Sequence, residues 1–262
     1  MALEVTYDTV VEGGEGGRIG LLGLLVFDEQ AFKFIAITAA SVAGDGQLFE
    51  ASGEAIGEVS GSRPDMYDEA RLRPAWTLLT PVVLAQGVAI GEARLALLEE
   101  RHYPILGRTA GRLLGRPVLV HLPRRGPVEA TLSSTSANFA MFVEDGSRAP
   151  VYFFDALDLS VEGGESSWAR SGDAGALVTT RDGEVLGIVV SAARERIYAA
   201  PVEPLLRELG SCRLLSDEIL AKSRTSAASW LLADGAQDNA GADDSGDPPA
   251  EVEPGLAPGD EV

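Results

Sequence analysis

The 262-residue sequence contains few of the residues from which disulfides, metal sites and proton-transfer sites are built. Its one cysteine, Cys212, excludes an internal disulfide, so packing must hold the fold, as expected in a reducing compartment. The two histidines, His102 and His121, lie apart from each other and from Cys212, and match no zinc-ligand spacing. No glycine-rich nucleotide loop precedes a helix. We therefore expect neither a metal nor a cofactor.

The sequence also has no long apolar segment and no excess of positive charge. Its longest apolar run, Leu21 to Phe27, is interrupted by Gly23 and is too short to cross a bilayer. Glu4 and Asp8 stand where a signal peptide would have a basic and then an apolar region, so we expect a cytoplasmic protein without a membrane partner. The formal net charge of −19 argues against a nucleic-acid partner, because phosphates would be repelled.

Much of this charge lies at the C-terminal end. Residues 233–262 contain nine acidic residues, four prolines, and no lysine, arginine or aromatic residue. This composition cannot bury enough apolar surface to fold, so a disordered acidic tail is expected, with solubility as its simplest role. Residues 215–232 are predicted to form an amphipathic helix before it. Only Lys33 and Lys222 are lysine, which we interpret as the codon bias of a GC-rich bacterium.

Residues 18–210 have the pattern of antiparallel strands, with short apolar stretches between turn residues. A first hairpin is predicted from residues 21–27 and 32–38, and Asp182-Gly183 predicts a tight turn. Further strands are predicted at residues 117–122, 128–132, 139–143, 151–154, 175–179 and 184–190. Residues 201–209 predict a helix that ends at Gly210. The expected fold is all-β, with two packed barrels or, as the alternative, a single β-sandwich.

One short stretch resembles a known family. Gly172-Asp173-Ala174-Gly175 is similar to the GDSG turn of trypsin-like (chymotrypsin-fold) serine proteases, with Ala174 at the nucleophile position. The chain continues LVTTRDGEVLGIVVSA and later IYAAPVEPLLRELG. In that family the turn likewise leads into a strand, a hairpin ending in a Gly-Ile-Val strand, and a helix entered through a proline. The resemblance implies two antiparallel six-stranded β-barrels and a C-terminal helix.

Further matches extend the resemblance over residues 18–210. Thr38-Ala39-Ala40-Ser41 resembles the family's Thr-Ala-Ala-His, with Ser41 at the histidine position. Arg94-Leu95-Ala96-Leu97-Leu98 resembles Asp-x-Ala-Leu-Leu, with Arg94 at the acid position, and residues 75–79 are the alternative. Residues 104–118 resemble the start of the second barrel in bacterial members. The implied division is an N-terminal barrel half at 1–100, a C-terminal half with its closing helix at 101–212, and the helix and tail at 213–262.

The resemblance implies a site without its catalytic triad. In the triad a histidine takes the serine proton, and a buried acid stabilises the histidine cation. Ala174 has no nucleophilic atom, Ser41 cannot act as a base, and Arg94 would oppose an imidazolium. The implied oxyanion hole, from the backbone N–H groups of Gly172 and Ala174, does not depend on these side chains. Trp168 would occupy the base of the specificity pocket, unless it is a core residue.

Three interpretations follow from these residues. The chain could be an unrelated β-protein with an ordinary turn. It could be a serine-type endopeptidase, either an inactivated variant of an active enzyme or one with a relocated nucleophile. The candidate nucleophiles are then Ser41, Ser171 and Cys212, each of which needs His102 or His121 as its base. We favour a pseudo-protease that binds or regulates a protein or peptide partner, because three coordinated losses indicate natural decay of catalysis. The sequence indicates neither the partner nor the oligomeric state.

Overall fold

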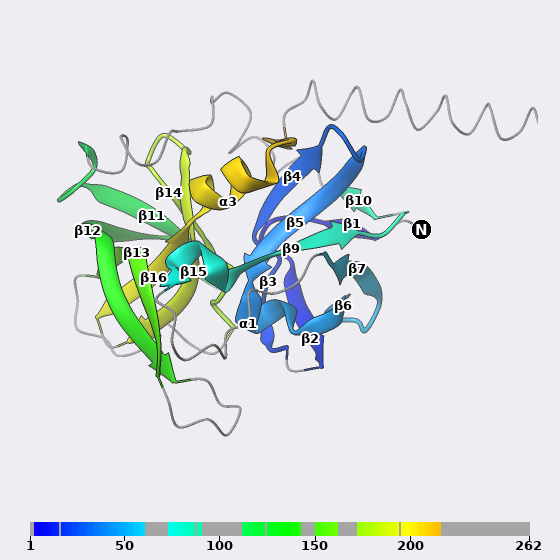
Figure 1. Cartoon of the computed structure of the whole chain (residues 1–262), viewed down its shortest axis with the longest axis horizontal. Helices are drawn as coiled ribbons and strands as arrows, with labels where there is room; N and C mark the ends of the chain where they lie inside the picture. The colour runs from blue at the N-terminus through cyan, green and yellow to red at the C-terminus, as the bar shows by residue number, and fades with distance from the viewer. Residues whose placement is uncertain are drawn as a thin grey trace, which may run out of the picture. The chain divides into compact units, whose positions relative to one another are not determined.

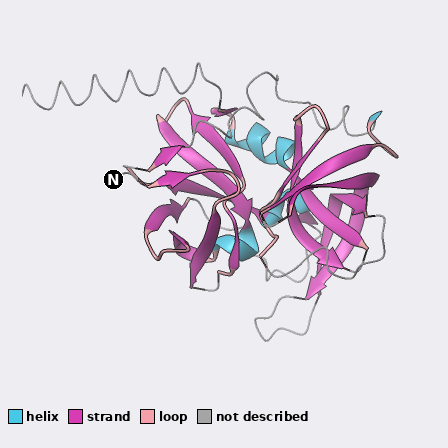
Figure 2. Cartoon of the chain, turned by 180° about the vertical axis from the view of Figure 1, so that it is seen from behind, coloured by secondary structure: helices cyan, strands magenta, loops and turns pink. Residues whose placement is uncertain are grey.

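The computed structural model describes residues 3–15, 17–60, 73–86, 88–90, 112–123, 125–142, 150–161, 172–193 and 195–215. Contacts divide the chain into two units, Met1–Leu220 and Ala221–Val262, and all described residues belong to the first. This part is almost entirely β-structure, as Figure 2 shows in magenta. The predicted helix at 215–232 and the predicted disordered tail at 233–262 lie outside it.

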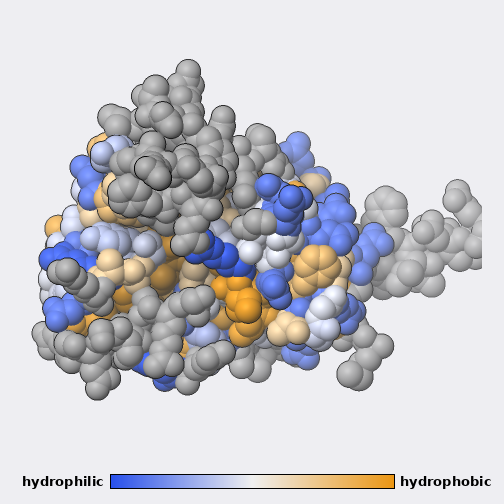
Figure 3. Space-filling view, turned by 90° about the horizontal axis from the view of Figure 1, so that it is seen from below, coloured by the Kyte–Doolittle hydropathy of each residue, from blue (hydrophilic) through white to orange (hydrophobic). Residues whose placement is uncertain are grey.

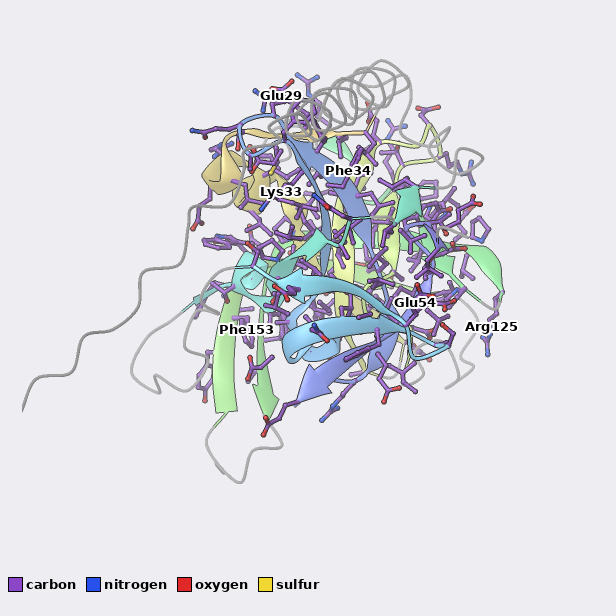
Figure 4. All side chains as sticks on the ribbon, turned by 90° about the vertical axis from the view of Figure 1, so that its right-hand side faces the viewer. Glu29, Lys33, Phe34, Glu54, Arg125 and Phe153 are labelled. Atoms are coloured by element: carbon purple, nitrogen blue, oxygen red, sulfur yellow. The ribbon has the colours of Figure 1, made fainter. Side chains whose placement is uncertain are left out.

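Eight strands form the first sheet, drawn in blue to cyan in Figure 1 apart from β17, which comes from the C-terminal end of the described chain. In spatial order they are β17 (Cys212–Leu214), β4 (Leu24–Asp28), β5 (Lys33–Ala39), β9 (Leu79–Leu84), β7 (Ala55–Val59), β6 (Asp45–Glu50), β2 (Val10–Glu15) and β3 (Ile19–Leu21). All these neighbours pair antiparallel. Figure 4 labels Glu29 in the β4–β5 connection, with Lys33 and Phe34 at the start of β5.

Seven strands form the second sheet, drawn largely in green and yellow in Figure 1. Their order is β12 (Gly126–Phe142), β11 (Pro117–Leu122), β14 (Leu177–Thr179), β15 (Val185–Ala193), β16 (Arg196–Pro201), β13 (Pro150–Ser160) and β8 (Arg73–Pro74). Because β12 also pairs with β13, the strands β11 to β16 close into a six-stranded barrel. Elsewhere, β1 (Glu4–Val5) pairs in parallel with β10 (Ala89–Ile90).

The predicted all-β class with two antiparallel sheets is confirmed, with local differences. The expected strand 21–27 is divided, because Gly23 has a φ of +84° and a side chain there would collide with the Ile37 carbonyl. The expected strands 128–132 and 139–143 form one long strand, β12, whose pairing with β13 is interrupted by register shifts. Short edge strands such as β17 and β8 bring the described sheets to eight and seven strands.

Helical segments are short. The predicted C-terminal helix is present as α3 (Val202–Leu209), which ends at Gly210 with a φ of +61°. The sequence prediction missed α1 (Ala40–Ala43), which follows β5 directly, and the 3-10 helix η1 (Ala75–Leu78), which precedes β9. Both are single turns without a helical periodicity that sequence patterns can detect.

One hydrophobic core runs through both sheets. The first sheet contributes buried side chains such as Leu25 and Ile37, and the second contributes Leu157 and Ile188. Figure 3 shows one face of the molecule on which an apolar patch lies among hydrophilic residues. Among the described residues, the exposed large hydrophobic side chains are Val10, Ile19, Phe32, Leu114 and Tyr152. No helix in the described part of the chain is long and apolar enough to span a membrane.

Candidate functional site

The site is built around the Gly172–Gly175 turn, which leads into β14. Both of its glycines have positive φ, +110° at Gly172 and +91° at Gly175, a region that L side chains rarely adopt. The Gly175 N–H donates to the Val189 carbonyl (2.9 Å), and the Val189 N–H donates to the Ala176 carbonyl (2.8 Å). The turn is therefore held against β15 by its own backbone.

The same turn is bonded to the first sheet, although the two segments are far apart in sequence. The Leu21 N–H donates to the Ala174 carbonyl (2.8 Å), and the buried Thr38 hydroxyl donates to the Leu21 carbonyl (2.7 Å). A side chain at Gly175 would collide with the Leu21 carbonyl and lie 3.0 Å from Thr38 Oγ1. The turn thus lies where the two sheets meet.

Ser41 lies on α1, which also reaches this contact. A Cβ atom at Gly20 would collide with the Val42 side chain and lie 2.7 Å from the Ala174 carbonyl oxygen. Gly20 is therefore the common neighbour of the helix that carries Ser41 and of the turn that carries Ala174. Ser41 itself is half-buried, and its hydroxyl makes no hydrogen bond within the described residues.

Two segments are candidates for the position that corresponds to the family's catalytic acid, residues 94–98 and residues 75–79. Arg94 lies outside the described residues, so its assignment stays a prediction. The strand that pairs with β5 is β9, with Leu79 opposite Ala39, and η1 before it contacts α1. The alternative segment, residues 75–79, thus lies beside α1 and offers a buried Thr77. Ala75, which this alternative alignment places at the acid position, is buried as well.

The arrangement matches solved structures, although no family model and no curated protein matches the sequence. Protease A of Thermobifida fusca aligns with a TM-score of 0.54 at 14% identity, covering 81% of this chain and 98% of its own. The protease of Nocardiopsis gives 0.53 at 13% identity, covering 80% and 98%. The chymotrypsin of Cellulomonas bogoriensis gives 0.53 at 16% identity, covering 81% and 99%.

The chain has the trypsin-like fold. At these identities the likeness shows the fold alone, so what the site does must come from its own residues. Three of the predicted site residues lie in the part of the chain that the structure describes: Ser41, Gly172 and Ala174. Trp168, Ser171 and His102 lie outside it, so their roles stay predictions.

The Gly172–Gly175 turn has two backbone N–H groups that could donate hydrogen bonds to a ligand. Within the described residues, the N–H groups of Gly172 and Ala174 donate no hydrogen bond. A Cβ atom placed on Gly172 would have no heavy atom within 4 Å, so the backbone borders open space at that residue. Two unpaired N–H groups in one turn can bind a carbonyl or carboxylate oxygen.

Two candidates for a relocated catalytic site lie within the described residues, His121 as a base and Cys212 as a nucleophile. His121 lies in β11 and is buried, with Nε2 2.8 Å from Thr179 Oγ1 and its ring against Tyr7. Cys212 is buried in β17, where burial and the negative charge of Asp28 raise the pKa of its thiol to about 11. The thiol is therefore protonated at neutral pH, and the thiolate is the form that attacks substrates. No cluster of three or more metal-binding side chains occurs in the described ranges.

Proposed function

We propose that this chain is a pseudo-protease, which uses a trypsin-like fold to bind a protein or peptide partner and does not hydrolyse it. The observation that carries the proposal is the Gly172–Gly175 turn, whose backbone is held by both sheets while Ala174 provides no nucleophile. The single cysteine, which excludes an internal disulfide, supports placing the protein in the reducing cytoplasm.

The missing chemistry is specific. Peptide hydrolysis in this fold needs a serine Oγ, a base to take its proton and a group that stabilises the resulting cation. A methyl group stands at position 174 and a neutral hydroxyl at position 41, neither of which accepts a proton at neutral pH. Without the triad, only the contribution of the oxyanion hole and of binding remains, about 10³–10⁴-fold over water in proteases of this kind. That is too little for a working protease.

The binding capacity does not need those side chains. An extended peptide can add to a strand edge through main-chain hydrogen bonds, while pockets select its side chains. The N–H groups of Gly172 and Ala174, which donate no hydrogen bond within the described residues, would then bind one carbonyl oxygen of that peptide. The partner is proposed to be a protein or peptide segment with an extended backbone, since the groups offered by Gly172 and Ala174 are backbone N–H groups.

The first experiment separates binding from hydrolysis. The full chain is incubated with a fluorophosphonate probe, and its cleavage of casein is followed. We expect neither labelling nor turnover, whereas labelling lost in Ser41→Ala, or in a Ser171→Ala variant, would support the alternative, a serine-type endopeptidase with a relocated nucleophile. Binding is then measured on a peptide array with Ala174→Leu, and with Ala193→Leu as a control at an exposed alanine. Only Ala174→Leu should lose binding.

A second experiment rebuilds the triad. Ala174→Ser should stay inert, and Ser41→His with Ala174→Ser should react with the fluorophosphonate faster, since a positioned base contributes about 10²–10⁴-fold. Adding Arg94→Asp or Ala75→Asp then shows which position supplies the acid, because only the correct one should raise the rate further. A folded double variant that reacts no faster than Ala174→Ser would contradict the assignment of Ser41.

A further inference from the structure

Residues 6–9 form a compact turn near the N-terminal end. The Thr6 N–H donates to Thr9 Oγ1 (2.8 Å), the Thr6 hydroxyl donates to Asp8 Oδ1 (2.7 Å), and the Thr9 N–H donates to the Thr6 carbonyl (2.9 Å). These bonds fix the turn locally, so that Tyr7 is presented in a defined position. We call residues 6–9 the N-terminal turn.

The N-terminal turn contacts both sheets. On the side of the first sheet, the Gly23 N–H donates to the Tyr7 carbonyl (2.8 Å) and the Leu22 N–H donates to the Thr9 carbonyl (2.9 Å). On the side of the second sheet, the Tyr7 ring meets the His121 ring edge to face, with centroids 5.9 Å apart and planes at 86°. Tyr7 thus connects residues 22–23 with β11.

His121 is 6% exposed although its side chain can carry a charge. Its Nε2 lies 2.8 Å from Thr179 Oγ1 in the neighbouring strand β14. Burial lowers the pKa of His121, because an imidazolium in this position would lose most of its hydration. Burial between Tyr7 and Thr179 therefore favours the neutral form of the His121 ring over the charged form.

Charged side chains on the surrounding elements do not offset this cost. They are Asp8 in the N-terminal turn, Arg125 after β11, Glu129 in β12 and Arg181 after β14. Asp8 accepts the Thr6 hydroxyl, and Arg181 pairs with Glu129 at 2.5 Å. The pKa of His121 is lowered by burial alone, so none of these groups acts on it as a counter-charge.

We propose that protonation of His121 releases the N-terminal turn from β11 and thereby loosens the segment that holds the Gly172–Gly175 turn. The connection runs through the backbone, since Leu22 and Gly23 bind the N-terminal turn while the adjacent Leu21 donates to the Ala174 carbonyl. Neutral His121 keeps the site assembled. A protonated ring draws in water, displaces Tyr7 and frees residues 21–23.

The direction of the pH effect follows from linkage. A histidine whose pKa is lowered in the folded state binds fewer protons there than in the unfolded state, whose value is about 6.5. The stabilisation by neutral His121 is present above pH 6.5 and is lost as the pH falls toward the folded pKa. The folding equilibrium constant should decrease by up to the ratio of the two acid dissociation constants.

The direct test follows the full-length protein by NMR from pH 8 to pH 5. The His121 ring should titrate below pH 6.5, and the amide signals of Leu22, Gly23 and Leu21 should shift with the same midpoint. If the ring titrates while these amides stay unchanged, His121 does not control the segment and the proposal is wrong. A ring that titrates at 6.5 or above would overturn it as well.

A pair of variants tests the same coupling through stability. His121→Gln stays neutral, and should lose the pH dependence of unfolding in this range, while His102→Gln should keep it. If His121→Gln does not fold, Tyr7→Ala replaces it. Removing the Tyr7 ring opens His121 to water, so its NMR midpoint should rise toward 6.5. An unchanged midpoint in Tyr7→Ala, or an unchanged slope in a folded His121→Gln, would contradict the proposal.

Discussion

The backbone around the Gly172–Gly175 turn differs from the side chains at positions 41 and 174 in how closely it is packed and hydrogen-bonded. The backbone is crowded at Gly175, which has no room for a side chain, and Leu21 is hydrogen-bonded through both its N–H and its carbonyl. By contrast, the Ser41 hydroxyl has no hydrogen bond within the described residues, and Ala174 presents only a methyl group.

If the chain is the proposed pseudo-protease, this difference explains how the fold can be kept while the catalytic side chains are replaced. Replacing a catalytic side chain leaves the packing almost unchanged, since the chemistry used atoms that the fold does not need. Replacing a residue of the backbone framework forces strain or a lost buried hydrogen bond. Three sets of substitutions test this contrast. They are ordered from the largest to the smallest expected loss in the free energy of unfolding.

Gly175→Ala should have the largest effect. Its φ of +91° and the contact with the Leu21 carbonyl combine backbone strain with overpacking, at a cost of about 3 kcal/mol in the free energy of unfolding. Gly172→Ala is the matched control, because its φ of +110° carries strain while its Cβ meets open space, so about 1–2 kcal/mol is expected. Urea unfolding measures both. Equal losses would show that crowding at Gly175 is unimportant.

Thr38→Val should have an intermediate effect. It removes the hydroxyl that donates to the Leu21 carbonyl and leaves that buried oxygen without this donor, which costs about 1–2 kcal/mol. Thr80 lies opposite Thr38 in β9, and its buried hydroxyl has no partner within the described structure. Thr80→Val should therefore be neutral or stabilising under the same urea titration. A comparable loss in both variants would mean that the Thr38 bond contributes nothing.

Ser41→Ala and Ala174→Ser should have the smallest effects. Both exchange a few atoms at half-buried positions and break no hydrogen bond of the described framework, so changes within about 0.5 kcal/mol are expected. Casein turnover should stay at background in both. A loss of more than 1 kcal/mol in either variant would show that these side chains do belong to the framework.

Local sequence patterns predicted much of the fold. Residues 117–122 were predicted as a strand and form β11, and the helix after Pro201 ends at Gly210 as its sequence indicates. The GDAG turn was identified by its resemblance to the GDSG turn of trypsin-like serine proteases, and its two glycines have positive φ in the structure. The predicted site residues Arg94 and Trp168, and the predicted domain boundaries, stay predictions.

Other features depended on contacts between distant segments. The pairing of β17 with β4, the position of η1 against α1, and the contact of Tyr7 with His121 join residues with no local pattern in common. A sequence window that contains Tyr7 gives no sign of its contact with His121. Such contacts follow from how the two sheets meet, and that is decided by packing over the whole core.

The sequence by itself determined the β-rich character of the chain, the glycine positions of its turns, the absence of a basic side chain at position 41 and the absence of a nucleophilic one at position 174. These are properties of single residues and of short-range periodicity. The tertiary structure decided that Leu21, Thr38 and Gly175 support one another, and that the helix carrying Ser41 and the turn carrying Ala174 meet at Gly20. The physical reason is that close packing and buried hydrogen bonds are set by the three-dimensional arrangement of segments, which local sequence does not encode.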